Sequence, residues 1–134
     1  MTFQMYLIVA AGGALGTAAR YFLSGLVANA FGQTFPWGTL IINVTGSFII
    51  GFFGTLTGPD GRFLVSGTAR QFVMVGVCGG YTTFSSFSLQ TLSLANDGEW
   101  LQAAGNITAS VFLCLLFVWL GATAAAALNQ LKGA

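Results

Sequence analysis

Four long apolar stretches, separated by short polar segments, make up almost the whole chain. They run over about residues 3–27, 36–56, 71–95 and 100–128. Each holds about the 20 residues that an α-helix needs to cross the hydrocarbon core of a bilayer. The segments between them contain Gly, Pro, Asn and Asp, which are typical of turns. The pattern predicts one all-α membrane domain, residues 1–134, with four transmembrane helices.

Composition and charge support this class and argue against several functions. Of the 134 residues, 55% are hydrophobic and 5% are charged, against roughly 25% charged in soluble domains. A net charge of +1 does not suggest binding to nucleic acid. The chain has no His, and Asp60, Asp97 and Glu99 all fall in predicted loops. No general base or metal-ligand set is therefore expected at membrane depth, and we do not expect an enzyme. The two cysteines, Cys78 and Cys114, are interpreted as packing residues.

The loop charges give only a weak signal for orientation. Arg62, Arg70 and Lys132 fall on one predicted side of the membrane, and Asp97 and Glu99 fall on the other. Basic residues favour the cytoplasmic side. Because this bias rests on three residues, insertion in both directions stays open.

The third stretch contains a polar interruption. Residues 79–88 begin with two adjacent glycines, and five of the seven positions 82–88 are Ser or Thr. Adjacent glycines weaken a helix. Non-helical backbone at membrane depth is tolerated only where it is buried in protein or lines a wet cavity. We therefore expect a broken helix built around something polar.

Neutral polar side chains recur at helical spacing in the neighbouring spans. Thr39 and Asn43 lie four residues apart, as do Asn106 and Ser110, so each pair shares a helix face. Hydroxyls and amides donate the hydrogen bonds that an anion requires. Conduction needs several weak sites rather than one tight site, which favours such uncharged donors. Ordinary hydrogen bonding between helices is the alternative interpretation.

Two aromatic residues and one arginine are further candidates. Phe84 and Phe87 lie three residues apart, and the positive edges of their rings can contact an anion. Spacing alone favours simple packing for both. Arg20 is the single cation of the first stretch. It either snorkels to an interface or lies near a pore mouth, where it attracts anions or clamps a polar neighbour.

Small residues four apart suggest close helix packing. Examples are Gly12 with Gly16 and Gly76 with Gly80. Because four short spans can hardly enclose a polar path alone, we expect such packing between subunits as well as within one chain.

Three segments of the chain resemble motifs of the CrcB/Fluc family of fluoride channels. Residues 12–21 (GGALGTAARY) resemble its GGxxG…RY motif, and residues 43–51 (NVTGSFIIG) resemble NxxGSFxxG. Residues 76–87 (GVCGGYTTFSSF) resemble GxxGGxTTFSTF. The resemblance covers nearly the whole length, with the motifs in the family's order.

The resemblance implies an architecture and partners. It implies four spans with the third broken in mid-membrane, and an antiparallel homodimer of two chains inserted in opposite directions. It also implies two fluoride pores per dimer. A structural sodium ion would lie at the dimer centre, held by the backbone carbonyls of Gly79 and Thr82.

The resemblance further implies the residues of the pore. Phe84 and Phe87 would contact fluoride through their ring edges, and Asn43 would donate a hydrogen bond to it. Arg20 would lie near a vestibule. Ala104 stands where some relatives have a tyrosine, so any role of that aromatic residue is missing. The remaining lining residues would be Thr39, Ser85, Ser86 and Ser110.

Together these points predict a passive channel that exports cytoplasmic fluoride across a bacterial inner membrane. Its partners would be fluoride, the lipid bilayer and a second identical chain. Two other classes stay open. A small coupled transporter would also use a broken helix, although the spans contain no acidic residue. A structural membrane subunit would use the polar residues only to hold helices together.

Overall fold

The computed structural model describes residues 2–131, and this part of the chain is helical apart from its connections. Lys132, used above in the orientation argument, lies outside the described residues. The elements in chain order are α1 (Phe3–Phe31), α2 (Trp37–Leu56), α3 (Gly67–Gln71), the π-helix η1 (Phe72–Cys78), α4 (Gly79–Tyr81), α5 (Phe84–Asn96) and α6 (Trp100–Leu131).

Four helical segments are long and apolar enough to cross a membrane. They are α1, α2, the combined third segment Gly67–Asn96 and α6, with 29, 20, 30 and 32 residues. At a rise of about 1.5 Å per residue, even a helix of about 20 residues spans the hydrocarbon core of a bilayer. The prediction of an all-helical protein with four membrane-length segments is confirmed.

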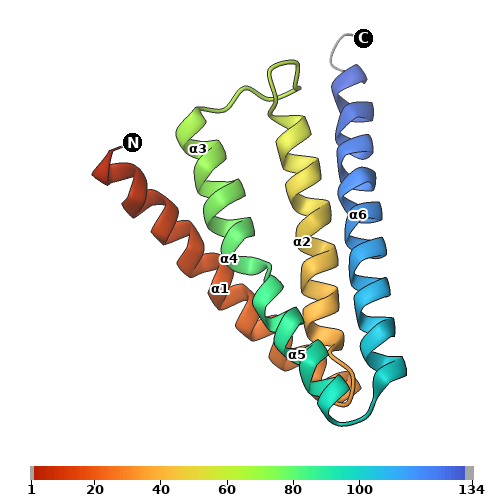
Figure 1. The fold of residues 1–134 in the computed structure, drawn as a ribbon. Coiled ribbons are helices and arrows are strands. Elements are labelled where there is room, and N and C mark those ends of the chain that lie inside the picture. Colours follow the sequence, from red (N-terminus) through yellow and green to blue (C-terminus); the bar gives the residue numbers. More distant parts are fainter. Residues whose placement is uncertain (1, 132–134) are drawn as a thin grey trace.

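The segments form two groups that meet near one end (Figure 1). α2 and α6 lie side by side and run in the same direction, whereas α1 leans against η1 and α4 of the third segment. The start of α1, the end of α6 and the α2–α3 connection lie at one end of the molecule. The α5–α6 connection lies at the opposite end. The third segment therefore crosses between α1 and the α2–α6 pair.

Glycines allow the close contact between α1 and the third segment. A Cβ added to Gly12 would lie 2.6 Å from the main-chain oxygen of Phe72, and one added to Gly80 would lie 2.5 Å from that of Gly13. Gly16 and Gly76 are equally confined by backbone of the facing helix. The two predicted glycine pairs thus pack against each other within one chain, and this use requires no second subunit.

The third segment is interrupted near its middle, at Thr82 and Thr83. Both have extended backbone, with φ/ψ of −85°/159° and −153°/115°. The break lies within residues 79–88, where the sequence predicted it, and Gly79 and Gly80 belong to the helical turn α4 that precedes it. The absence of a side chain at Gly80 serves the close approach to α1 rather than an unusual backbone conformation.

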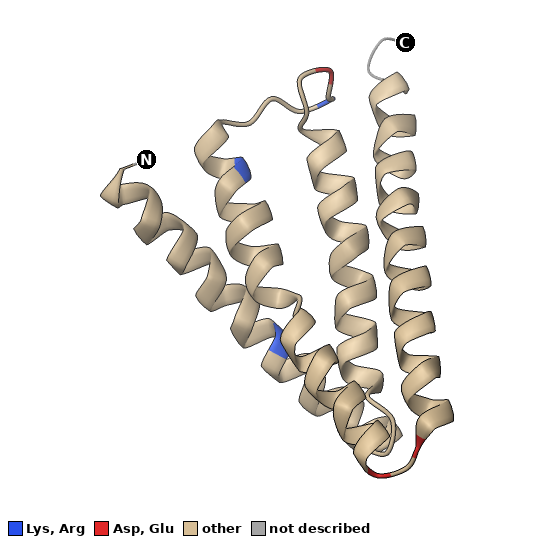
Figure 2. Cartoon of the chain, in the orientation of Figure 1, with Lys and Arg blue, Asp and Glu red and all other residues tan. Residues whose placement is uncertain are grey.

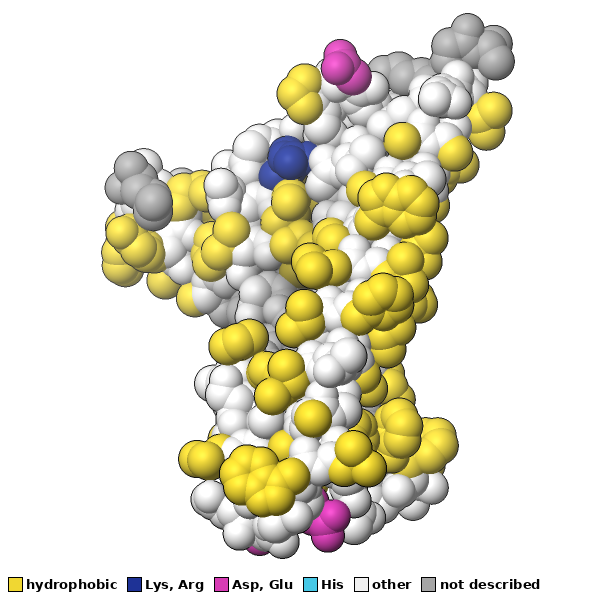
Figure 3. Space-filling model, turned by 45° about the vertical axis from the view of Figure 1, so that its right-hand side comes forward, with side chains coloured by type: hydrophobic (Ala, Val, Ile, Leu, Met, Phe, Trp, Pro, Cys, Tyr) yellow, Lys and Arg dark blue, Asp and Glu magenta, His cyan; other side chains and the backbone are white. Residues whose placement is uncertain are grey.

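The outer surface is apolar, and charge is confined mostly to the two ends. Large apolar side chains are highly exposed, for example Leu101 at 88%, and Figure 3 shows them spread over most of the face in view. Acidic and basic residues cluster at the ends, apart from one basic position part-way along α1, which is Arg20 (Figure 2). Such extensive apolar exposure suits a bilayer rather than water. The chain is a multi-pass membrane protein.

Candidate functional site

The break in the third segment is held by the side chain of Asn43 on α2. Its Oδ1 accepts a hydrogen bond from the Thr83 N–H at 2.8 Å, and its Nδ2 donates to the Thr83 carbonyl at 3.0 Å. One amide thus satisfies both backbone groups of a residue that has left the helix. A primary amide has two N–H groups, so the second N–H of Asn43 stays available to another acceptor.

The backbone carbonyls of Gly79 and Thr82 are among those that lose their helical partners at this break. In a continuous helix the Thr83 N–H would bond Gly79 and the Ser86 N–H would bond Thr82. Here the Thr83 N–H donates to the Asn43 Oδ1 instead, and the Ser86 N–H donates to the Thr83 hydroxyl at 3.1 Å. Among the hydrogen bonds of residues 2–131, the Gly79 and Thr82 carbonyls do not receive the bonds that a continuous helix would supply. Within the same range no three His, Cys, Asp or Glu side chains gather as a metal site.

Arg20 and Thr17 of α1 both hydrogen-bond a backbone carbonyl of the helical turn α4, that of Gly80. The Arg20 Nε donates to the Gly80 carbonyl at 3.1 Å, and the Thr17 hydroxyl donates to the same oxygen at 3.4 Å. The Arg20 side chain is partly buried by these contacts. It therefore clamps a polar neighbour, one of the alternatives considered for it above, and does not simply extend to an interface.

A cavity of about 420 Å³ lies beside the break, between α2, the third segment and α6. No residue that lines it is charged. Six predicted site residues line it together, from three segments of the chain: Asn43, Gly79, Thr82, Phe84, Phe87 and Ser110.

The two phenylalanines of this cavity differ in their surroundings. Their ring centroids are 5.3 Å apart with the planes tilted by 47°. Phe87 is 9% exposed and forms part of the packed wall, whereas Phe84 is 78% exposed. Spacing predicted a common face for both rings, but only Phe87 is covered by this chain alone.

Two residues outside the predicted lining connect Ser110 to the third segment. The Ser110 hydroxyl donates to the Asn106 Oδ1 at 3.4 Å, and the Asn106 Nδ2 donates to the Thr91 hydroxyl at 2.9 Å. Thr91 in turn donates to the Phe87 carbonyl at 2.7 Å. Asn106 is only 2% exposed, so this amide is a buried link between α6 and α5. Helical spacing in the sequence indicates both residues, because Asn106 precedes Ser110 by four positions and Thr91 follows Phe87 by four.

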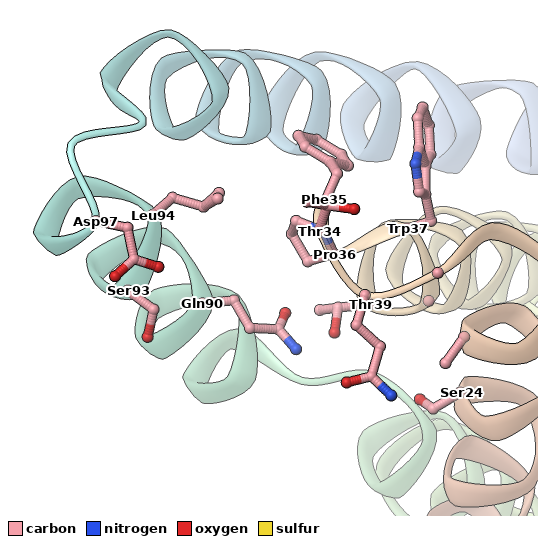
Figure 4. A pocket seen from close by; sticks show the side chains of 14 residues that line it. Ser24, Thr34, Phe35, Pro36, Trp37, Thr39, Gln90, Ser93, Leu94 and Asp97 are labelled. Carbon is pink, nitrogen blue, oxygen red and sulfur yellow. The ribbon is translucent and has the colours of Figure 1, made fainter.

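Three of the predicted lining residues lie elsewhere. Thr39 lines a second cavity, of about 330 Å³, near the end that holds the α5–α6 connection. Figure 4 shows it with Gln90 and Asp97, which come from α5 and the connection after it. Ser85 and Ser86 belong to the first turn of α5, where the Ser85 hydroxyl is 3.3 Å from that of Thr83. Neither serine lines either cavity.

Comparison with known proteins identifies the family. The family described as "CrcB-like protein, Camphor Resistance (CrcB)" matches residues 7–122. The chain belongs to the CrcB family. The resemblance drawn from the three motifs is thereby confirmed.

Similar proteins cover almost the same length as this CrcB-family chain. A "Fluoride-specific ion channel FluC" of Opitutus terrae is 64% identical over 130 residues, which is 97% of this chain and 98% of that protein. Proteins of the same name from Rhodospirillum rubrum and Methylocella silvestris are 65% and 61% identical, over 93% and 96% of this chain and 97% and 98% of theirs. These relatives are named as ion channels and not as enzymes.

Proposed function

We propose that this chain forms a passive, fluoride-selective channel whose path passes the break in the third segment. The observation that carries the proposal is the uncharged cavity in which Asn43, Ser110 and two phenylalanines meet. The names of the relatives supply the ion, since each is called a fluoride-specific ion channel.

The cavity suits a small anion that must be bound and then released. The free N–H of Asn43 and the hydroxyl of Ser110 donate hydrogen bonds without fixed charge, and the phenylalanine edges add weak electropositive contacts. The long bond from Ser110 to Asn106, 3.4 Å, leaves that hydroxyl able to turn toward an ion. Weak sites in series favour conduction over tight binding. Ser85, Ser86 and Thr39 would extend the donor path, and Arg20 would lie at a vestibule.

Transport in this proposal is driven by the membrane potential and the gradient alone. The described cavity contains no acidic residue that could carry a coupled proton. An inside-negative potential is worth about 2.3 kcal/mol per charge per 100 mV. It therefore drives an anion out of the cell, as export from a bacterial cytoplasm through the inner membrane requires.

The proposed assembly is an antiparallel homodimer with two pores. A single chain leaves Phe84 78% exposed, although it borders the cavity. A second chain would cover this ring and close the path. The opposite insertion of the two chains agrees with the weak asymmetry of charge between the ends.

A sodium ion at the dimer centre would take main-chain oxygens of Gly79 and Thr82 from both chains. In favour of this assignment, the break releases both carbonyls from helical hydrogen bonding. Broken helices in membrane proteins use such carbonyls for cations. The ion would be structural and would not be transported.

Ion efflux from liposomes that contain the purified chain tests the function. Fluoride and chloride electrodes would follow both anions after a potassium ionophore is added. We expect rapid fluoride loss with chloride retained. Fluoride loss only under an imposed proton or sodium gradient would indicate a coupled transporter, and no loss of either ion from folded protein would favour a structural subunit.

The orientation and the sodium ion need separate measurements. Single cysteines placed in the α2–α3 and α5–α6 connections of a Cys78→Ala/Cys114→Ala background would report insertion. An impermeant thiol reagent should label about half of the chains at each position, because the two insertions are equally populated in the dimer. Labelling at one position only would contradict the antiparallel arrangement. Purification without sodium should lower dimer stability if the ion is structural.

A further inference from the structure

A chain of side-chain hydrogen bonds runs from the cavity wall on α6 to α5. The Ser110 hydroxyl bonds Asn106 at 3.4 Å, and Asn106 bonds Thr91 at 2.9 Å. Thr91 in turn bonds the Phe87 carbonyl at 2.7 Å. Ser110 and Phe87 line the cavity of about 420 Å³, whereas Asn106 and Thr91 do not. Asn106 therefore reaches the cavity through Ser110 and not by direct contact.

The number of protons on each group fixes the direction of these bonds. A carbonyl only accepts, so Thr91 gives its single hydroxyl proton to Phe87. Thr91 must then accept from Asn106, which presents its NH2 group to it. The Asn106 Oδ1 is left to face Ser110, and an amide oxygen only accepts. The one hydroxyl proton of Ser110 is thus committed to Asn106.

This commitment affects any anion that enters the cavity. The Ser110 proton points to Asn106, so the cavity faces the hydroxyl oxygen and its lone pairs. An anion has to draw the proton away from Asn106 before Ser110 donates to it. The Ser110 hydroxyl is the one donor to the Asn106 Oδ1 among residues 2–131. Because Asn106 is only 2% exposed, bulk water does not replace the bond once it is broken.

We propose that Asn106 is a positioning residue that competes with fluoride for the Ser110 proton and so keeps the ion weakly held. This inference rests on the proposed function, because it requires fluoride to reach Ser110. Conduction needs sites that release an ion as well as bind it, and a competing acceptor lowers affinity without adding charge. The expected effect is about threefold in affinity, the equivalent of the average of about 0.6 kcal/mol for a hydrogen bond in a membrane protein.

The concentration dependence of fluoride efflux from liposomes tests the competition. Initial rates at a series of internal fluoride concentrations, with a potassium ionophore present, give a half-saturating concentration and a maximal rate. Asn106→Leu keeps the branched shape of the side chain and removes its acceptor. We expect it to lower the half-saturating concentration about threefold. The maximal rate should fall as well, because a more tightly held ion leaves more slowly.

The half-saturating concentration separates competition from a merely structural role. A loss of folded protein lowers the maximal rate alone. Gln102→Leu is the matched control, because it removes an amide from the same helix, one turn before Asn106. Gln102 bonds Glu99, and neither residue lines the cavity, so this variant should have the wild-type half-saturating concentration. Asn106→Ala replaces Asn106→Leu if the latter fails to elute as folded protein.

A double substitution tests whether the effect passes through Ser110. In a Ser110→Ala background no proton is left to compete for, so adding Asn106→Leu should not change the half-saturating concentration further. A threefold decrease that persists in this background would overturn the proposal. An Asn106→Leu value equal to or above that of the wild type would overturn it too.

Failure of the proposed function gives a different result. Liposomes with the folded wild-type chain would then show no fluoride efflux, and the role of Asn106 would fall with the function. Wild-type efflux with an unchanged half-saturating concentration in Asn106→Leu would refute only the role of Asn106.

Discussion

Replacing Asn43 by Ala should destabilise the broken segment as well as reduce fluoride flux. The substitution removes both hydrogen bonds that hold Thr83, at 2.8 and 3.0 Å. At about 0.6 kcal/mol for each bond in a membrane protein, the loss would be about 1 kcal/mol. If both backbone groups stayed unsatisfied, the cost would be about 1–3 kcal/mol for each, or up to about 6 kcal/mol.

Solvent access decides between these limits. Asn43 and Thr83 both border the cavity of about 420 Å³, which is large enough for water. Water can therefore replace part of the lost bonding, and we expect a decrease of about 1–3 kcal/mol in the free energy of unfolding.

Denaturant unfolding in detergent, at fixed protein concentration, measures this effect. Thr45→Ala is the matched control on the same helix. Its hydroxyl is exposed and bonds Tyr81 and its own helix, so its removal should cost well under 1 kcal/mol. Equal stability of Asn43→Ala and Thr45→Ala would refute the role of Asn43 in holding the break.

Three further substitutions test other parts of the molecule. Gly16→Ala should lower the free energy of unfolding by about 1–3 kcal/mol through overpacking, because its Cβ would collide with the backbone of η1. Gly25→Ala, which has open space around its Cβ, is the control and should be neutral or stabilising. Equal effects of the two substitutions would contradict the packing of α1 on η1. Arg20→Met should lower both the melting temperature and the fluoride flux, since it removes the hydrogen bond from Arg20 to the Gly80 carbonyl. Reduced flux at unchanged stability would instead indicate a purely electrostatic role for Arg20. Ser110→Ala should reduce fluoride efflux with little change in stability, because the hydrogen bond from its hydroxyl to Asn106 is long. Thr108→Ala, on the exposed side of α6, is the control and should retain efflux. Equal efflux in the two variants would remove Ser110 from the path.

Several structural features follow from the sequence because their causes are local. Segment length and apolar content determine which stretches can cross a bilayer, and the four predicted segments coincide with the four long helical segments. The cluster of hydroxyl residues after Gly80 indicated the break. Helical periodicity also placed Asn106 and Ser110 on one face of α6, where the Ser110 hydroxyl donates to the Asn106 Oδ1.

Other features depend on contacts between segments distant in the sequence. The role of Gly80 is one, because its neighbour Gly13 lies across a helix interface and the missing side chain allows that close approach, while the backbone stays helical until Tyr81. The pairing of Asn43 with the Thr83 backbone is another, because it requires α2 and the third segment to be in register.

Thr39 and Asn43 show most clearly what helical periodicity in the sequence does not predict. They lie one turn apart on the same face of α2, yet they border different cavities. The sequence by itself determined that the chain is a four-segment membrane protein with an interrupted third segment and a set of uncharged donors. Only the tertiary structure decided which donors share a space, because the third segment crosses α2 at an angle, and a face defined by helical periodicity can meet different neighbours at each turn.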